Sequence, residues 1–212
     1  MFGQTRQVYQ TSGANLPTSS QAGLTLDTTG LVSSNSYSVE FVTKLFDRNG
    51  AWRRLIDVQN RQSDNGFYVD PSNNLNVYPI HGSSANFTTS TYHDVVLVDN
   101  AGTVSAYLDG VQQFSVATTV MDINNADNPG NLMNFYLDNL GGSGQGEYSN
   151  ANTALIKLYS GALSSSDVTV LDRNPFAGAP STVPEGNSVV LLTFAMAPLG
   201  LMLSSRPLRR RQ

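Results

Sequence analysis

The chain has 212 residues, of which 40% are hydrophobic and only 13% are charged, and its formal net charge is −4. This length is enough for one domain with a sizeable core. Residues 1–180 hold eight basic and fifteen acidic residues, a net charge of −7. This acidic balance excludes nucleic acid as the expected partner, because phosphate binding needs a basic surface. The chain has no cysteine, which excludes disulfides, thiolate metal sites and cysteine nucleophiles.

Apolar and polar residues alternate with a period of two along most of the chain, which predicts β-strands. The expected strands cover 37–46, 52–59, two segments within 65–79, three within 93–117, then 132–140 and 153–163. Asp109 and Gly110 favour a two-residue hairpin turn, because both tolerate positive φ. A short helix is expected within 163–174, with Ser164 as N-cap and Asp167 three residues later. Many short strands separated by turns predict an all-β sandwich or barrel.

The C-terminal part differs in composition from the rest. Residues 174–182 are rich in Pro, Gly and Ala and indicate a linker, and the apolar run Val189–Leu203 follows. A helix rises 1.5 Å per residue, so a membrane span needs roughly 20 residues, and residues 187–205 come near this length. We therefore expect a membrane-inserted helix, which the positive-inside rule orients with its arginines in the cytoplasm. The alternative is a buried strand or core helix with a solvated basic end.

Two stretches of the body resemble laminin-G-like (concanavalin A-like) jelly-roll domains. The first is TVSAYLDGVQQF, whose Tyr107–Gly110 form the pattern, and the second is TALIKLYSGALSSSDVTVL, within 153–171. The resemblance implies a jelly-roll β-sandwich over residues 20–173. Family members usually carry a further strand and a signal peptide upstream. We therefore expect residues 1–19 to be an N-terminal segment left by a truncated start.

The tail, residues 183–212, resembles the PEP-CTERM sorting signal of Gram-negative bacteria. The resemblance rests on Val183, Pro184 and Glu185, followed by the apolar run and by Arg206, Arg209, Arg210 and Arg211. Gly186 stands where the last proline of the motif is usual. The resemblance implies recognition by an exosortase-type enzyme and cleavage near Pro-Glu. It also implies an inner-membrane precursor, followed by a mature protein at the cell surface or in the extracellular matrix.

An enzymatic role is weighed because concanavalin A-like folds include glycosidases. Retaining β-glucanases of this fold carry a Glu-x-Asp-x-x-Glu strand, but Phe41 and Val42 follow Glu40, and the other glutamates are Glu147 and Glu185. His81 and His93 lack a GxSxG elbow and are expected to be solvated turn residues. We expect a non-enzymatic exported protein that binds glycan or protein. The alternatives are a divergent polysaccharide hydrolase or lyase, and a purely structural matrix protein.

Oxygen-rich loops make calcium the candidate cofactor. Asp138 and Asn139 follow a predicted strand and Glu147 follows the Gly-rich loop 141–146, so a loop that folds back would bring their oxygens together. Turn and cap chemistry is the alternative interpretation of these residues. A second oxygen-rich loop, DINNADN at 122–128, departs from the EF-hand pattern at its third ligand position, Ala126.

Aromatic residues beside Asn or Asp suggest a glycan site, because ring faces pack on sugar faces and amides bind hydroxyl groups. The candidates are Trp52, Tyr68, Tyr78 and Tyr148. The competing interpretation is that these side chains fill the sandwich core, as most aromatic residues on strands do.

Overall fold

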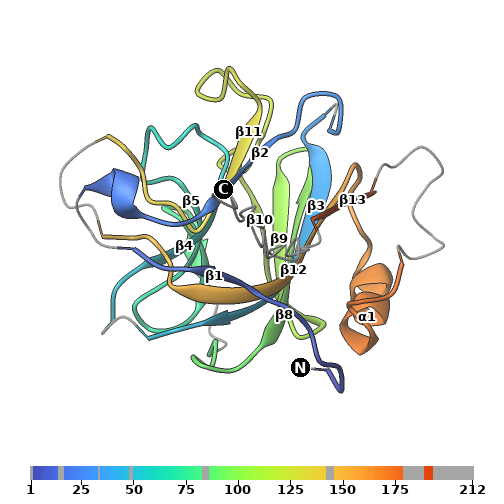
Figure 1. The fold of residues 1–212 in the computed structure, drawn as a ribbon. Coiled ribbons are helices and arrows are strands. Elements are labelled where there is room, and N and C mark those ends of the chain that lie inside the picture. The colour runs from blue at the N-terminus through green and yellow to red at the C-terminus, as the bar shows by residue number, and fades with distance from the viewer. Residues whose placement is uncertain are drawn as a thin grey trace, which may run out of the picture.

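Two antiparallel sheets form the protein (Figure 1). The computed structural model describes residues 2–13, 17–32, 34–47, 50–82, 86–141, 146–178 and, for the backbone, 189–192. The seven-stranded sheet has the order β1 (Tyr9–Thr11), β12 (Ala151–Tyr159), β3 (Ser36–Leu45), β8 (His93–Asn100), β9 (Thr103–Leu108) and β10 (Val111–Ala117), with β13 (Val189–Leu192) also paired to β12.

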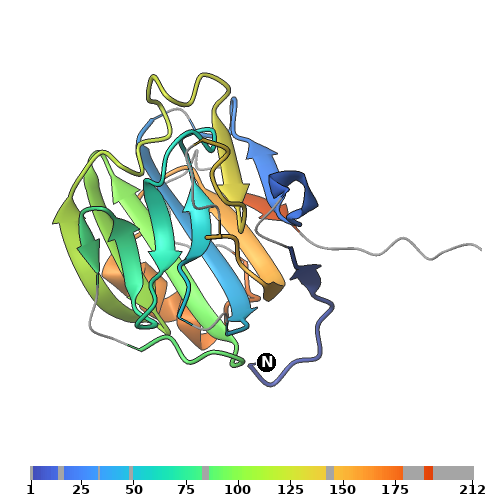
Figure 2. The same cartoon turned by 90° about the vertical axis from the view of Figure 1, so that its left-hand side faces the viewer.

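The second sheet has six strands and carries the candidate site. Its order is β2 (Leu24–Asp27), β11 (Leu132–Phe135), β4 (Arg53–Asp57), β5 (Gly66–Val69), β6 (Leu75–Tyr78) and β7 (His81–Gly82). A 3-10 turn, η1 (Thr18–Ser20), precedes β2, and one helix, α1 (Ser165–Arg173), follows β12. Figure 2 shows the six-stranded sheet in front of the seven-stranded one, with α1 behind both. This confirms the prediction of an all-β sandwich.

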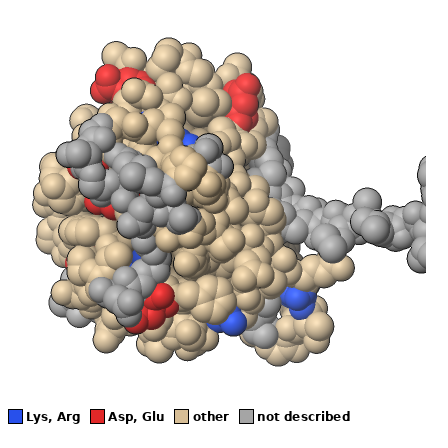
Figure 3. Space-filling model, turned by 60° about the vertical axis from the view of Figure 1, so that its left-hand side comes forward, with Lys and Arg blue, Asp and Glu red and all other residues tan. Residues whose placement is uncertain are grey.

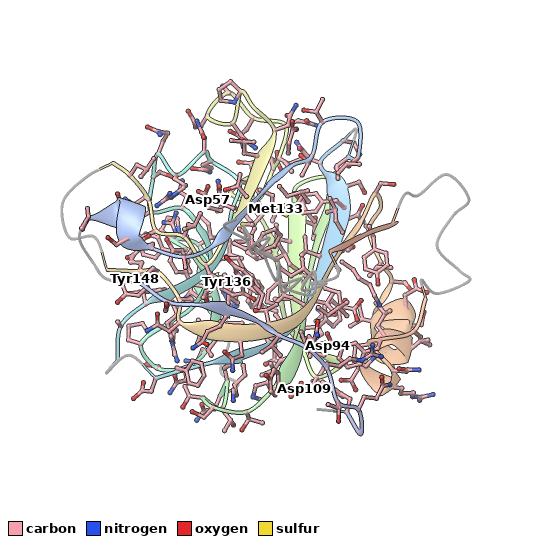
Figure 4. All side chains as sticks on the ribbon, viewed as in Figure 1. Asp57, Asp94, Asp109, Met133, Tyr136 and Tyr148 are labelled. Carbon is pink, nitrogen blue, oxygen red and sulfur yellow. The ribbon has the colours of Figure 1, made fainter. Side chains whose placement is uncertain are left out.

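The core lies between the two sheets and is mostly aliphatic and aromatic. Phe41 of β3 and Phe67 of β5 meet edge to face across it, with ring centroids 6.4 Å apart. Tyr136, just after β11, lies between the sheets (Figure 4), where its hydroxyl bonds to Thr43 and Thr153 of the seven-stranded sheet. Burial raises the pKa of Tyr136 to about 12, so the phenol stays neutral. These buried hydrogen bonds fix the position of the six-stranded sheet relative to the seven-stranded sheet.

Helix α1 covers the outward face of the seven-stranded sheet. Ser164 and Asp167 form the predicted capping box, and Val168 and Leu171 pack against Tyr159. Strand β3 is therefore covered on both faces, which explains why nearly all of its residues are buried although its sequence alternates. Figure 1 shows α1 on the side of this sheet that faces away from β4 and β5, so the helix leaves the outward face of the six-stranded sheet free for loops.

A buried ion pair lies on the same outward face. The Lys157 ammonium is 3.2 Å from Glu40, and it also donates to the carbonyls of Pro175 and Ala177 at 2.6 and 3.0 Å. Both charges are almost fully buried, so each needs its partner. The pair joins β12 to β3 and fixes the chain segment that leads away from the sandwich after α1.

Both ends of the described chain add short strands to β12. Strand β1 pairs with residues 151–153 and β13 with residues 156–159. The sequence did not predict β1, which makes part of the expected N-terminal segment a member of the sheet, whereas β13 agrees with the alternative of a strand in the apolar run. Over Val189–Leu192 the structure has a strand where a membrane helix was expected, while residues 193–212 and the motif at 183–185 lie outside the described residues. No helix in the described ranges is long and apolar enough to cross a membrane.

The hairpin between β9 and β10 forms as predicted, and its turn also accounts for the buried position of His93. Asp109 and Gly110 have φ values of 49° and 73°, as the turn requires. The Asp109 carboxylate contacts His93 Nδ1 at 2.6 Å and accepts from the Asp94 amide at 3.0 Å. His93 Nε2 lies 3.0 Å from the Thr88 carbonyl. The expectation of a solvated histidine is therefore wrong for His93, which is only 7% exposed.

We predict that His93 stabilises the fold more at low pH than at high pH. Burial lowers the pKa of His93. The hydrogen bond and charge of Asp109, together with the Thr88 carbonyl, raise this pKa by more than burial lowers it, so the folded pKa lies above the usual value. The contribution is therefore fully present below about pH 6.5 and is lost as the pH rises through the folded pKa. Urea unfolding of His93→Gln against the parent should show a larger stability difference at pH 5.5 than at pH 8.5. The exposed His81→Gln serves as control, and a difference that grew with pH would contradict the assignment.

Candidate functional site

Three of the four aromatic candidates gather on the six-stranded sheet. The rings of Trp52 and Tyr78 lie 5.3 Å apart, and each also contacts Tyr68, with centroids 5.5 and 6.3 Å away. All three pairs meet edge to face, the arrangement that aromatic quadrupoles favour. We call Trp52, Tyr68 and Tyr78 the aromatic cluster.

The cluster lies on the outward face of the sheet. Phe67, Val69 and Val77 belong to the core between the sheets. Because side chains alternate along a strand, Tyr68 and Tyr78 point the other way. Tyr78 is 38% exposed and Trp52 is partly exposed, whereas Tyr68 is buried beneath them. Two aromatic side chains are therefore open to solvent, and the third supports them.

A buried arginine holds Tyr68 in place from below. The Arg54 guanidinium lies 4.9 Å from the Tyr68 ring centroid and opposes Tyr68 in the β4–β5 register. Its nitrogens are 3.4 Å from Asp57 and 3.6 Å from Glu147, and one donates to the Ser63 carbonyl at 3.1 Å. The side chain has no exposed surface, so these contacts replace its water.

Tyr68 and Glu147 complete the contacts around Arg54. The Tyr68 hydroxyl lies 2.9 Å from Glu147 Oε2 and 2.7 Å from the Asp64 carbonyl. Burial raises the pKa of Tyr68, so it remains a neutral donor. Burial also raises the pKa of Glu147, although the Tyr68 hydrogen bond and Arg54 partly oppose this. The loop carrying Glu147 is thereby drawn over the sheet next to the aromatic cluster.

A polar row continues across the sheet on the far side of Arg54. Asp57 accepts from the Arg61 amide at 2.9 Å and from the Asn134 side chain at 3.0 Å, and Asn134 accepts from Thr25 at 2.7 Å. The row therefore joins β2, β11 and β4 on the face that carries the aromatic cluster. Asp57 is fully buried and its carboxylate is engaged by donors, which makes it a structural group.

The model described as the concanavalin A-like lectin/glucanases superfamily matches residues 18–169. The chain belongs to this superfamily. A search of curated proteins found no match to the sequence. The sequence resemblance to a laminin-G-like, concanavalin A-like sandwich is thus confirmed for the body of the chain.

Solved structures with the same fold have different activities. Domain 4 of the GH43 extracellular arabinanase AbnA from Geobacillus stearothermophilus, solved with arabinotriose, is 21% identical, with a TM-score of 0.51 and 80% of this chain and 82% of that chain covered. The SAP-like pentraxin from Limulus polyphemus is 16% identical, with a TM-score of 0.54 and coverage of 88% and 92%. A Trypanosoma rangeli sialidase complex is 14% identical, with a TM-score of 0.52 and coverage of 82% and 32%. At these identities the likeness concerns the fold alone.

In this concanavalin A-like domain, Asp138 anchors a loop. Its Oδ2 accepts from the amides of Gly146 and Glu147 at 2.6 and 3.0 Å, and its Oδ1 accepts from the Asn139 amide at 2.9 Å. Asp138 is fully buried, and the Asn139 side chain donates to the Gly141 carbonyl. The loop does fold back as predicted, but both Asp138 oxygens face N–H donors, which does not suit a calcium ligand.

The expected calcium ligands therefore do not converge as a set. Glu147 is held by Tyr68 and Arg54, and Asn139 bonds within its own turn. Within the described ranges, no three His, Asp or Glu side chains are grouped so that they could hold a metal ion. Tyr148, the fourth aromatic candidate, is only 8% exposed and does not offer a ring face to solvent.

Three polar residues on this face of the sheet were not singled out from the sequence. Arg54, Asp57 and Asn134 lie on strands that were assigned from alternation alone. The available signal was the presence of Arg53, Arg54 and Asp57 in a short strand otherwise made of apolar residues. Charged side chains in such a strand are almost never fully buried unless they are paired, so they predict an internal ion pair.

We predict that Asp138→Ala destabilises the protein by about 2–4 kcal/mol, because it leaves three backbone amides without their acceptor. The exposed Asp127→Ala is the matched control and should change the free energy of unfolding by less than about 0.5 kcal/mol. Urea unfolding in calcium and in EDTA measures both. The loss should be equal in the two buffers, and a loss present only with calcium would show that Asp138 is a metal ligand.

Proposed function

We propose that this protein is a non-enzymatic glycan-binding domain of the cell surface or the exopolysaccharide matrix. The observation that carries the proposal is the exposed pair Trp52 and Tyr78, which is supported from below by Tyr68 on Arg54. Preorganised aromatic side chains suit a sugar ligand, because little side-chain entropy is lost on binding. The fold supports the proposal, since its solved relatives include a domain crystallised with arabinotriose.

We expect neutral rather than acidic glycans. Asp64 is exposed and Glu147 is one-quarter exposed beside Tyr68, and Asp70 lies near Gly82 on the neighbouring strands. Among the described cations of this region, Arg53 and Arg54 are buried, and Arg61 is half-buried with its side chain bonded to the Asp138 carbonyl. On the side of the molecule shown in Figure 3, the described charged side chains occur as isolated spots among neutral ones. An anionic sugar would meet the carboxylates of Asp64 and Glu147 here.

The absence of catalysis is part of the proposal. Glycoside hydrolysis needs two carboxyl groups free to transfer a proton and to attack or stabilise the sugar. Near the aromatic cluster, Asp57 and Asp138 are buried and accept hydrogen bonds from fixed donors, and Glu147 is bonded to Tyr68, whereas Asp64 is exposed. These contacts favour a binding surface over a divergent hydrolase or lyase.

We predict that Trp52→Ala and Tyr78→Ala each weaken glycan binding at least tenfold, since a buried aromatic contact is commonly worth more than 1.4 kcal/mol. Affinity electrophoresis in arabinan, other neutral polysaccharides and polygalacturonate measures this. Val111→Ala, an exposed apolar change on the other sheet, should leave binding unchanged. Equal retardation of all variants, or none of the parent, would contradict the proposal. Release of reducing ends would instead support an enzyme.

The tail enters the same proposal as a sorting signal. Val183, Pro184 and Glu185 would be recognised by an exosortase-type enzyme. The apolar run would hold the precursor in the inner membrane, and the terminal arginines would remain cytoplasmic. Processing would then place the domain at the surface, where extracellular polysaccharide is the partner.

We predict that deleting residues 183–212 moves the protein from the membrane fraction to the soluble fraction. A second truncation that ends at residue 192 keeps β13 and should behave in the same way, because it also lacks most of the apolar run and the arginines. Fractionation of cells that express the three forms measures the distribution. A truncated form that stays with the membranes would contradict the role of the tail.

A further inference from the structure

A polar side chain, Asn76, lies on the outward face of the six-stranded sheet next to the aromatic cluster. It stands directly opposite Tyr68 in the β5–β6 register, and Tyr78 follows two residues later on the same strand. Because side chains two residues apart on a strand share a face, Asn76 and Tyr78 point the same way, about 7 Å apart along the strand. Asn76 is half-buried, whereas its neighbours Leu75 and Val77 belong to the core.

The Asn76 amide is not used by the fold. Among the described residues, none forms a hydrogen bond with this side chain, and its Oδ1 and Nδ2 are not among the buried polar atoms that lack a partner. Asn73 and Asn134 differ in this respect, since Asn73 accepts from Arg53 and Asn134 donates to Asp57. Asn76 therefore meets solvent with an acceptor oxygen and an NH₂ donor available to a ligand.

A space beside the Asn76 amide is kept open by Gly82. This glycine of β7 opposes Asn76 in the β6–β7 register. A β-carbon at residue 82 would lie 2.6 Å from Asn76 Nδ2 and 3.7 Å from Asp70 Oδ2. The first distance is too short for a carbon atom, so any larger residue would displace the amide. The glycine thus leaves a space that is bordered by an amide donor and by a carboxylate oxygen.

Asp70 contributes one oxygen to this space. Its Oδ1 accepts from the Ser72 and Asn74 amides at 2.8 and 2.9 Å, which fixes the carboxylate in the turn between β5 and β6. Its Oδ2 accepts no hydrogen bond from the part of the chain that the structure describes. A fixed acceptor therefore lies close to an amide that offers both a donor and an acceptor.

We propose that Asn76 and Asp70 form a polar subsite for two adjacent hydroxyl groups of a sugar ring. The ligand is then a neutral glycan whose rings carry adjacent free hydroxyls. The subsite rests on the proposed function, glycan binding at Trp52 and Tyr78, and adds the class of glycan. One hydroxyl accepts from Asn76 Nδ2 and donates to Asp70 Oδ2, and its neighbour donates to Asn76 Oδ1. The aromatic side chains hold the ring, and these polar groups select among its hydroxyls.

Affinity electrophoresis of the full chain in three neutral polysaccharides tests the class of ligand. Linear arabinan and glucomannan leave two adjacent hydroxyls free on each backbone ring. In laminarin the linkage occupies the middle one of the three ring hydroxyls and so separates the free ones. The parent should bind arabinan or glucomannan at least about fivefold more tightly than laminarin, because laminarin cannot make both hydrogen bonds to Asn76. Laminarin bound as tightly as the better of the other two would overturn the proposal.

Asn76→Ala and Gly82→Ala test the residues, since the first removes the amide and the second displaces it. Each should bring the affinities for laminarin and for the preferred polysaccharide to within about twofold of one another. Asn124→Ala, which changes an exposed asparagine of the β10–β11 loop, is the matched control and should keep the preference. A preference that persists in Asn76→Ala would reject the subsite. The comparison of polysaccharides needs only the parent, so it decides the matter if a variant does not fold.

Failure of the subsite and failure of the proposed function give different results. If Trp52→Ala weakens binding but Asn76→Ala keeps the preference, the aromatic cluster binds glycan and the subsite is wrong. If the parent binds none of the three polysaccharides, or if Trp52→Ala binds as tightly as the parent, both proposals are wrong.

Discussion

The buried guanidinium of Arg54 is the constraint on which the outward face of the six-stranded sheet depends. A fully buried cation is stable only when paired and hydrogen-bonded, and Arg54 draws Asp57, Glu147 and the Ser63 carbonyl towards itself. These partners come from its own strand and from two loops. The loops must therefore lie over the sheet, and Tyr68 must lie on the guanidinium. Trp52 and Tyr78 then pack against a ring that cannot move.

The two sheets use buried cations in different ways. On the seven-stranded sheet Lys157 pairs with Glu40 and binds two carbonyls of the segment after α1, so its role is to anchor the chain beyond the helix. On the six-stranded sheet Arg54 supports side chains that reach the solvent. One face is covered by a helix and the other is organised by loops, and the aromatic cluster lies on the second.

The sequence predicted the strands well where alternation is long, and it predicted both the Asp109-Gly110 hairpin and the Ser164 capping box because these signals are local. It did not predict β1 or β7, since two or three residues carry no measurable periodicity. Three of the four aromatic candidates do come together, but alternation could not show that Tyr68 is covered by loops. The role of Asp138 was also not predictable. The sequence around an aspartate in a Gly-rich loop is the same whether its oxygens accept from amides or bind a metal ion. Only the folded loop distinguishes the two cases.

Trp52 is the only tryptophan in the chain, so its fluorescence reports on the aromatic cluster alone. The most direct test of the account is a titration of the full chain with the neutral oligosaccharide that it retains most strongly, followed by tryptophan emission. The account predicts a saturable change in intensity or wavelength, with the same Kd as calorimetry and with loss of the change in Tyr78→Ala. Binding detected by calorimetry without any change in Trp52 emission would place the glycan elsewhere and contradict the account.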